Sequence, residues 1–226
     1  MSRRLYWLAA LFLVATALAL PVDIPIAKFC TEGLVRDFFD TLLGLAEVFA
    51  HGLGAACILL TAFVLDAGHR RHMVRVVISV FGAGMLANLA KLVVGRLRPR
   101  TLMVDHVWDS FIGWFPVWSG NVPRGSRSLE VQSFPSGHAI VATALAIGLS
   151  ALYPRGRWLF VFFAVLAALQ RVQATAHYLS DTIAGAAIAC LFCGICFDAR
   201  LLGRWFDRWE ANSVGNRCDF PDEPLG

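Results

Sequence analysis

Three short clusters of polar residues interrupt an otherwise apolar sequence, and each contains residue types that could act on a phosphate group. The first closes an apolar run with Lys91 and Arg98, followed by Pro99. A spacing of seven residues places two side chains on nearly the same face of a helix. Two cations with no acidic residue between them favour anion binding, although both side chains could instead extend to the lipid headgroups.

The second cluster opens the next apolar run with Pro135, Ser136, Gly137 and His138. Proline followed by serine and glycine predicts a helix N-terminus. The free amides and positive dipole end of such a terminus suit a phosphate, and Gly137 would let an oxyanion approach the backbone closely. His138 could donate a proton to a leaving oxygen. The alternative is a capped helix with a histidine at the membrane interface.

The third cluster, Arg171, His177 and Asp181, lies between two further apolar runs. If this segment is helical, His177 and Asp181 are neighbours on one face. A carboxylate beside an imidazole fixes the tautomer and leaves the other ring nitrogen free to attack. Arg171 adds a planar donor that matches phosphate oxygens. A purely structural His–Asp pair is the alternative.

The composition indicates a membrane protein. Of 226 residues, 58% are hydrophobic and 16% charged, and the mean hydropathy is +0.63. Soluble domains are about half apolar and about a quarter charged. This apolar content excludes a disordered chain, and the length excludes a small disulfide scaffold. The net charge of +4 is too small to indicate nucleic acid as a partner.

Six apolar runs are candidates for membrane-spanning helices, which need about 20 residues each. They predict an all-α fold, a polytopic bundle of six transmembrane helices. The first run, with Ala17 and Ala19 near its end, also fits a cleavable signal peptide. The six runs are 5–20, 43–65, 74–94, 137–153, 158–176 and 179–202.

The arginines predict the orientation of these spans. Starting from a cytoplasmic N-terminus, alternation places three arginine-rich connections in the cytoplasm, in agreement with the positive-inside rule. The three polar clusters then share the opposite, extracytoplasmic face, although they are far apart in sequence. Both termini are expected in the cytoplasm of a multi-pass cell-membrane protein. The cytoplasmic arginines are Arg70, Arg71, Arg75, Arg155, Arg157, Arg200, Arg204 and Arg208.

The chain is expected to form one membrane domain followed by a short tail. The domain covers residues 1–211, with its catalytic motifs within 91–181 and an extracytoplasmic loop at 95–135. Residues 212–226 are polar and rich in Asp, Glu and Pro, so we predict a disordered cytoplasmic tail.

Together, the three clusters resemble the signature of the type 2 phosphatidic acid phosphatase (PAP2) superfamily, which also contains vanadium haloperoxidases. The matching parts are Lys91-x6-Arg98-Pro99, Pro135-Ser136-Gly137-His138 and Arg171-x5-His177-x3-Asp181. Each part alone is weak, but three in order with these spacings are highly specific. One position departs from the pattern, because Gln170 stands where that family usually has serine.

The resemblance implies an integral-membrane phosphatase that needs no metal and no cofactor. By matching positions, His177 would be the nucleophile that forms a phosphohistidine, and Asp181 would orient it. His138 would protonate the leaving group and then activate water. Three fixed cations and backbone donors can position and neutralise a phosphoryl group without a metal. The expected substrate-binding residues are Lys91, Arg98, Ser136, Gly137 and Arg171.

Several functions and substrates remain open at this point. A lipid phosphotransferase could use the same phosphohistidine, and a haloperoxidase could hold vanadate there. A non-catalytic scaffold or transporter would not need all of His138, His177 and Asp181 together. The expected partners are the bilayer and a phospholipid or isoprenoid-phosphate substrate. Candidates are undecaprenyl diphosphate, phosphatidylglycerophosphate, phosphatidic acid and a lipid A phosphate. The sequence predicts no oligomeric state.

Overall fold

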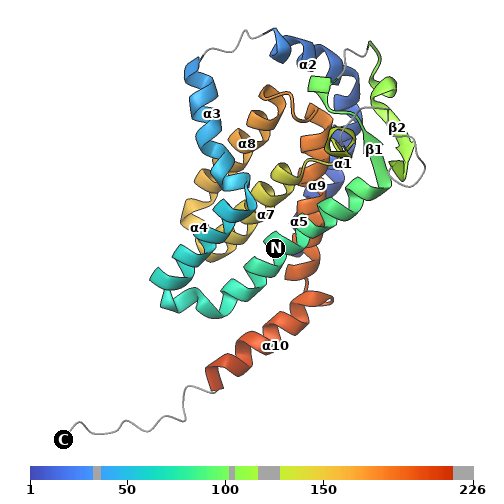
Figure 1. Cartoon of the computed structure of the whole chain (residues 1–226). Coiled ribbons are helices and arrows are strands. Elements are labelled where there is room, and N and C mark those ends of the chain that lie inside the picture. The colour runs from blue at the N-terminus through green and yellow to red at the C-terminus, as the bar shows by residue number, and fades with distance from the viewer. Residues whose placement is uncertain (33–36, 102–104, 117–127, 216–226) are drawn as a thin grey trace, which may run out of the picture.

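The protein is mainly helical, as the sequence predicts (Figure 1). The computed structural model describes residues 1–32, 37–101, 105–116 and 128–215. The helices are α1 (Ser2–Ala19), α2 (Asp23–Thr31), α3 (Asp37–Ala50), α4 (Gly52–Leu65), α5 (Arg70–Val93), α7 (Gly137–Leu152), α8 (Arg157–Gln173), α9 (Leu179–Phe197) and α10 (Leu202–Gly215). Two short strands, β1 (Val94–Arg96) and β2 (Phe111–Trp114), pair antiparallel.

Each of the six apolar runs is helical over most of its length. Fewer than six of the helices, however, are both long enough and apolar enough to count as membrane spans. In the described part of the chain, three helical segments are long and apolar enough to cross a membrane: Ser2–Thr31, Ala67–Val93 and Leu179–Phe197. The helices α3 and α4 make a fourth span if they are counted together, and α7 is a shorter apolar helix. The fold is therefore an apolar helical bundle, and a count of six spans stays a prediction.

The predicted single span 43–65 is broken at His51. The two helices on either side of this residue are bent by 72° relative to each other. His51 has an extended backbone, and its ring Nδ1 accepts a hydrogen bond from Leu53 N at 3.3 Å, which begins α4. A Cβ on Gly54 would lie 1.9 Å from the carbonyl oxygen of Val48, so only glycine fits this close approach.

The core lies where α5, α7 and α9 pack closely through small residues. A Cβ on Gly148 of α7 would lie 2.4 Å from Val76 Cγ1 of α5. A Cβ on Gly82 of α5 would lie 2.6 Å from the ring of Phe192 of α9. Small residues let helices in a membrane approach closely, where dispersion replaces the hydrophobic effect as the driving force. These contacts fix the three helices whose ends carry the polar clusters.

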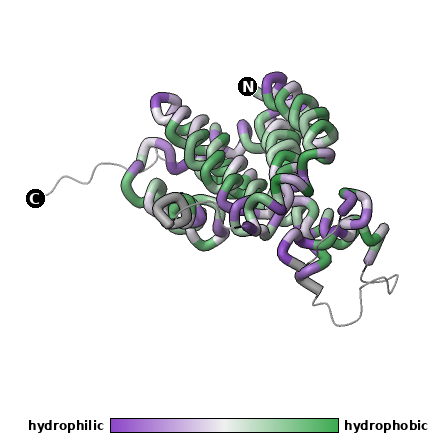
Figure 2. Tube along the Cα trace, turned by 90° about the horizontal axis from the view of Figure 1, so that it is seen from above, coloured by the Kyte–Doolittle hydropathy of each residue, from purple (hydrophilic) through white to green (hydrophobic). Residues whose placement is uncertain are grey.

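The outer surface is strongly apolar, as expected for helices that face lipid. The side chains of Trp7, Leu65 and Trp158 are 74%, 80% and 78% exposed. Figure 2 shows hydrophobic residues along most of the helices, with hydrophilic stretches mainly at helix ends and connections. A soluble monomer rarely exposes this much apolar surface.

The end of the molecule with the predicted cytoplasmic arginines is closed by α10. Arg75 of α5 forms ion pairs with Asp207 and Glu210 of α10, the second at 3.0 Å. His72 Nδ1 lies 2.8 Å from Glu210 Oε2. Because α10 extends through Gly215, the first four residues of the predicted disordered tail are helical, and residues 216–226 lie outside the described part.

Candidate active site

The first cluster is positioned by a strand rather than by a continuous helix. The helix α5 ends at Val93, so the expectation that Lys91 and Arg98 share one helix face is wrong. The chain continues as β1, in which Gly95 packs closely against β2, because a Cβ there would lie 2.6 Å from Ile112 Cγ1. Arg98 N then donates a hydrogen bond to the carbonyl oxygen of Glu130 at 2.9 Å. Residues near the second cluster thus fix the backbone at Arg98.

The second cluster starts α7, as predicted. Ser136 is fully buried, and its hydroxyl caps the helix by accepting a hydrogen bond from Ala139 N at 3.4 Å. A Cβ on Gly137 would lie 3.5 Å from Lys91 Nζ, so the ammonium group lies beside the helix N-terminus. Ser136 N donates to the backbone oxygen of Asp181 at 3.0 Å, which ties the second cluster to the third.

His177 lies in the connection between α8 and α9 and is 2% exposed. Its Nδ1 donates a hydrogen bond to the carbonyl oxygen of Ser133 at 2.7 Å. Because a carbonyl can only accept, this bond places the proton on Nδ1 and leaves a lone pair on Nε2. Burial lowers the pKa of His177 well below 6.5, and the positive charges of Arg98 and Lys91 lower it further. The lowered pKa favours the neutral form of the imidazole near neutral pH.

Asp181 is completely buried in the first turn of α9 and acts on His177 mainly through Ser133. Its Oδ2 accepts hydrogen bonds from Ser133 Oγ at 2.6 Å and from Tyr178 N at 3.0 Å. The distance from the same oxygen to His177 Nδ1 is 3.9 Å, which is too long for a hydrogen bond. Asp181 thus holds the residue whose carbonyl orients the histidine.

Arg96 was not predicted as a site residue, but it is completely buried and pairs with Asp181. Its guanidinium forms ion pairs with Asp181 and with Asp23 Oδ2, the latter at 2.7 Å. It also lies 4.5 Å from the ring centroid of Phe111 and 4.1 Å from that of Tyr178. A buried arginine is stable only with this degree of pairing. Arg98 and Arg100 lie close to Arg96 in the sequence, and nothing in this pattern indicates that Arg96 is the buried one.

Asp23 was also missed, and it connects the N-terminal helices to the third cluster. It is the first residue of α2 and is 1% exposed. Its Oδ1 accepts a hydrogen bond from Ser180 N at 2.9 Å, and its Oδ2 accepts one from the Ser180 hydroxyl. A single acidic residue at the end of a long apolar run was the available signal, because such residues are rarely left unpaired in a membrane protein.

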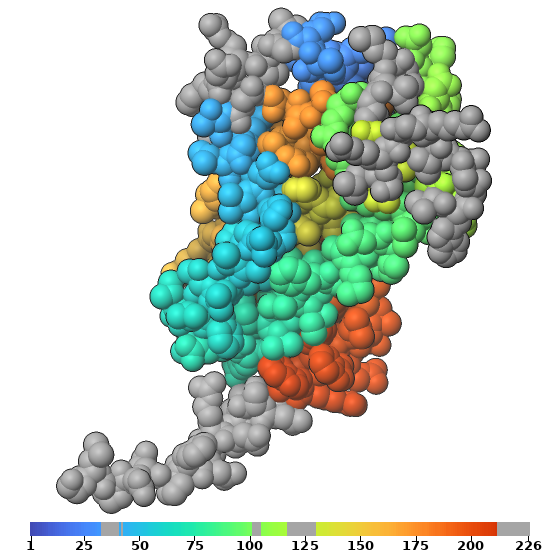
Figure 3. All heavy atoms as spheres, viewed as in Figure 1, coloured from blue at the N-terminus to red at the C-terminus, as the bar shows by residue number. Residues whose placement is uncertain are grey.

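Arg171 approaches the site from the last turn of α8, together with a carboxylate that the sequence analysis missed. Arg171 Nη2 lies 2.9 Å from Glu47 Oε1 of α3. The same oxygen is 3.7 Å from His138 Nε2. Gln170, the residue that departs from the family pattern, accepts from Arg171 Nε and donates to Glu47 Oε2 at 3.5 Å. Figure 3 shows α7 in yellow, recessed between α3 and α5.

The gathered cations favour an anion with more than one negative charge. The pKa of Arg98 is lowered first by burial and then by Arg100 and Arg171, while Asp181 opposes the shift. Such mutual repulsion is relieved when an anion binds between the cations. Among the described residues, no group of three or more His, Cys, Asp or Glu side chains is arranged to hold a metal ion.

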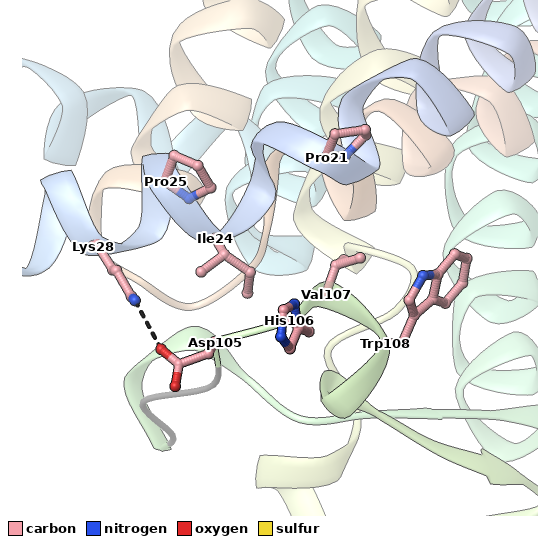
Figure 4. A pocket seen from close by; sticks show the side chains of 8 residues that line it. All are labelled: Pro21, Ile24, Pro25, Lys28, Asp105, His106, Val107 and Trp108. Carbon is pink, nitrogen blue, oxygen red and sulfur yellow. Dashed lines mark hydrogen bonds and ion pairs between the residues drawn. The ribbon is translucent and has the colours of Figure 1, made fainter.

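A separate groove of about 590 Å³ lies between α2 and residues 105–108 (Figure 4). Apolar side chains including Ile24 and Trp108 line it, and Lys28 Nζ contacts Asp105 Oδ1 at 3.1 Å on its rim. None of the predicted site residues lines it. The ion pair accounts for Lys28, one of the two lysines in the chain, while the other, Lys91, lies at the candidate site.

Comparisons with known proteins agree with this geometry. The family model described as the PAP2 superfamily matches residues 72–203, which include all three clusters. The chain belongs to the PAP2 superfamily. It is 31% identical over 207 residues to a lipid A 1-phosphatase of Rhizobium etli, covering 83% of this chain and 82% of that protein. It is 37% identical over 114 residues to a lipid A 1-phosphatase of Rhizobium johnstonii, covering 50% and 42%. No solved structure matches.

Membership of the PAP2 superfamily confirms the resemblance inferred from the three clusters. The protein is a membrane lipid phosphatase of the PAP2 type, with an all-α fold. The structure brings the predicted catalytic residues His138, His177 and Asp181 to one end of the bundle. It adds Glu47 and Arg96, neither of which belongs to the three motifs.

Proposed function

We propose that this protein hydrolyses a lipid phosphomonoester or diphosphate through a phosphohistidine formed on His177. The observation that carries the proposal is the hydrogen bond from His177 Nδ1 to the Ser133 carbonyl oxygen at 2.7 Å. It supports an unprotonated Nε2 as the attacking atom, in a site that Lys91, Arg98 and Arg171 make positive.

The proposed reaction needs only the side chains of the site, the lipid phosphate and one water molecule. Nε2 of His177 attacks phosphorus, and the bond to the lipid oxygen breaks. His138, which takes up a proton once the phosphate anion is bound beside it, gives that proton to the lipid oxygen. His138 then accepts a proton from a water molecule whose oxygen attacks phosphorus. The phosphorus–nitrogen bond breaks, inorganic phosphate leaves, and both histidines return to their starting states. The role of the cations is to position the phosphoryl group and to neutralise its charge.

The favoured substrate is a lipid A-type glycolipid that carries a phosphate at position 1. The two relatives named lipid A 1-phosphatase support this choice, the first of them over most of the chain. Undecaprenyl diphosphate, phosphatidylglycerophosphate and phosphatidic acid are the competing substrates. All four expose a phosphate to the same cations, so the lipid part must decide between them.

The site is proposed to face the extracytoplasmic side. The clusters lie at the end of α5 and α8 and at the start of α7 and α9. The arginine-rich connections lie at the other ends of these helices, where Arg75 meets α10. The positive-inside rule places that end in the cytoplasm.

Phosphate release from the purified protein in detergent micelles tests the proposal. The four lipids and a soluble phosphate ester are compared, with His177→Ala beside the unchanged protein. We expect one lipid to be hydrolysed much faster than the others and the variant to be inactive. Acid-labile phosphate trapped on the protein after rapid quenching would identify the phosphohistidine. Hydrolysis retained in His177→Ala would contradict the assigned nucleophile, and transfer to an added acceptor lipid without release would favour a phosphotransferase.

A further inference from the structure

We propose that Glu47 is a built-in counter-anion of the phosphate site, which gives up Arg171 to the arriving phosphoryl group and weakens the binding of product phosphate. The inference rests on the proposed function, because it assumes that phosphate binds between Arg171 and His138. Glu47 lies outside the three motifs and comes from α3.

The position of Glu47 is set by the break between α3 and α4. It lies in the last turn of α3, four residues before His51, whose extended backbone ends that helix. The ring of His51 lies 6.1 Å from that of His138, so the break itself borders the site. A straight helix would carry the chain past the site. The 72° bend instead presents the end of α3 to the N-terminus of α7 and the C-terminus of α8.

Glu47 contacts the same groups that a phosphate would contact. Its Oε1 lies 2.9 Å from Arg171 Nη2 and 3.7 Å from His138 Nε2. Arg171 also donates from Nε to Gln170, so one edge of its guanidinium is engaged within the protein. The carboxylate is 37% exposed, whereas Arg171 is 13% exposed. The glutamate is therefore the more accessible partner of the pair, and when a phosphate takes its place at Arg171 the largely buried guanidinium keeps an anionic partner.

The charge of Glu47 has opposite effects on the empty and the occupied site. In the empty site it offsets the repulsion among the cations and holds Arg171 in place. In the occupied site it repels the phosphoryl oxygens and competes for Arg171. A lipid substrate gains further binding free energy from its acyl chains, but inorganic phosphate does not. The carboxylate therefore weakens phosphate binding in both molecules, but the substrate keeps the contribution of its acyl chains, so that the product is the one that is released after each turnover.

Binding of inorganic phosphate tests this role directly. Titration calorimetry of the full protein in detergent, with inorganic phosphate as the probe, compares the unchanged chain with Glu47→Gln. We expect the dissociation constant to fall about tenfold in Glu47→Gln, which corresponds to roughly 1.4 kcal/mol. In the hydrolysis assay, the inhibition constant of phosphate should fall by the same factor. Glu47→Asp, which keeps the charge, should restore weak binding.

A matched control removes one negative charge elsewhere. Glu32→Gln, at the exposed end of α2, changes the net charge equally and should leave phosphate affinity and turnover unchanged. Equal phosphate affinity in Glu47→Gln and the unchanged protein would overturn the inference. Weaker binding in Glu47→Gln would also overturn it, because Glu47 would then serve only to position Arg171. If no lipid is hydrolysed but Glu47→Gln binds phosphate more tightly, the proposed function fails while the counter-anion role stands.

Discussion

Arg96 and Arg171 lie at the same end of the bundle, but they have different surroundings. Arg96 is completely buried, with two carboxylates, two serine hydroxyls and two aromatic rings around its guanidinium. The side chain of Arg171 is 13% exposed, and it contacts Glu47 and the amide of Gln170. One arginine has its charge fully compensated within the fold, whereas the other keeps capacity for an external anion.

This difference suggests different roles for the two cations: Arg96 stabilises the fold, and Arg171 is proposed to bind the ligand. A buried charge with complete pairing stabilises only as long as every partner remains, because each partner that is removed leaves an uncompensated charge. A partly exposed cation with one carboxylate can exchange that partner for a phosphate at small cost. The same residue type is therefore fully paired within the fold on β1, and on α8 it is the one that we propose to bind phosphate.

The largest predicted effect comes from removing the nucleophile, which should stop turnover and leave both groups of cations in place. His177→Ala should lower kcat by a factor on the order of 10³ or more. Phosphate should still bind to the variant in calorimetry, because the cations remain. His106→Ala, at an exposed position, is the matched control. Loss of activity in both variants would point to a folding defect instead.

Removing Arg96 from its buried cluster with Asp23 and Asp181 should reduce the stability of the protein. Arg96→Met leaves Asp23 and Asp181 buried without their cation, so we expect a loss of about 3–5 kcal/mol in the free energy of unfolding. Thermal unfolding in detergent measures this loss. Adding Asp23→Asn should recover part of it, because one of the two carboxylates no longer needs a counter-charge. A stable and fully active Arg96→Met protein would refute the structural role.

Removing Arg171, the partly buried cation on α8, should reduce activity and leave stability nearly unchanged. Arg171→Ala removes a donor to the phosphoryl oxygens, so kcat/KM should fall about 10²–10³-fold. The unfolding temperature should change little, since Arg171 has one ion-pair partner and that partner is partly exposed. A large drop in unfolding temperature together with intact turnover would reverse the assignment of the two arginines.

The smallest predicted effect is a dependence of stability on pH. The pKa of His177 is lowered in the folded protein, so below about pH 6.5 the unfolded chain binds more protons at this position. Stability should therefore fall as the pH drops below 6.5, and His177→Gln should flatten this part of the curve. The unfolding temperature measured between pH 5 and pH 8 checks the sign. A curve that is unchanged in the variant would show that another group is responsible.

The sequence predicted the helices and the three clusters because both depend on local patterns. Apolar runs of about 20 residues mark the helices, and residues such as Lys91 and His177 stand out at their ends. The pairing of β1 with β2 was not predicted, since strands of three and four residues leave almost no periodic signal. It also displaced Arg98 from the expected helix face. The bend at His51 was missed because its neighbours are uniformly apolar.

The other features that the sequence did not predict are contacts between residues far apart in the chain. Glu47 and Arg171 are 124 positions apart, and Asp23 and Arg96 are 73 apart. Neither pair has a spacing that predicts proximity, because each depends on how complete helices pack. The motifs named the residues that we propose to contact phosphate, but their partners Arg96, Asp23 and Glu47 became visible only in three dimensions.

The link between Asp23 and Ser180 has a consequence for the order in which the protein is assembled. Asp23 follows α1 in the chain, whereas its partners Arg96 and Ser180 are synthesised much later. Until both partners are in place, we expect the carboxylate of Asp23 to stay hydrated at the membrane surface. Completion of this link closes the bundle from its first to its last long apolar helix. A nascent chain truncated before residue 180 should therefore carry an accessible N-terminal segment, and translation past that point should protect it from proteases.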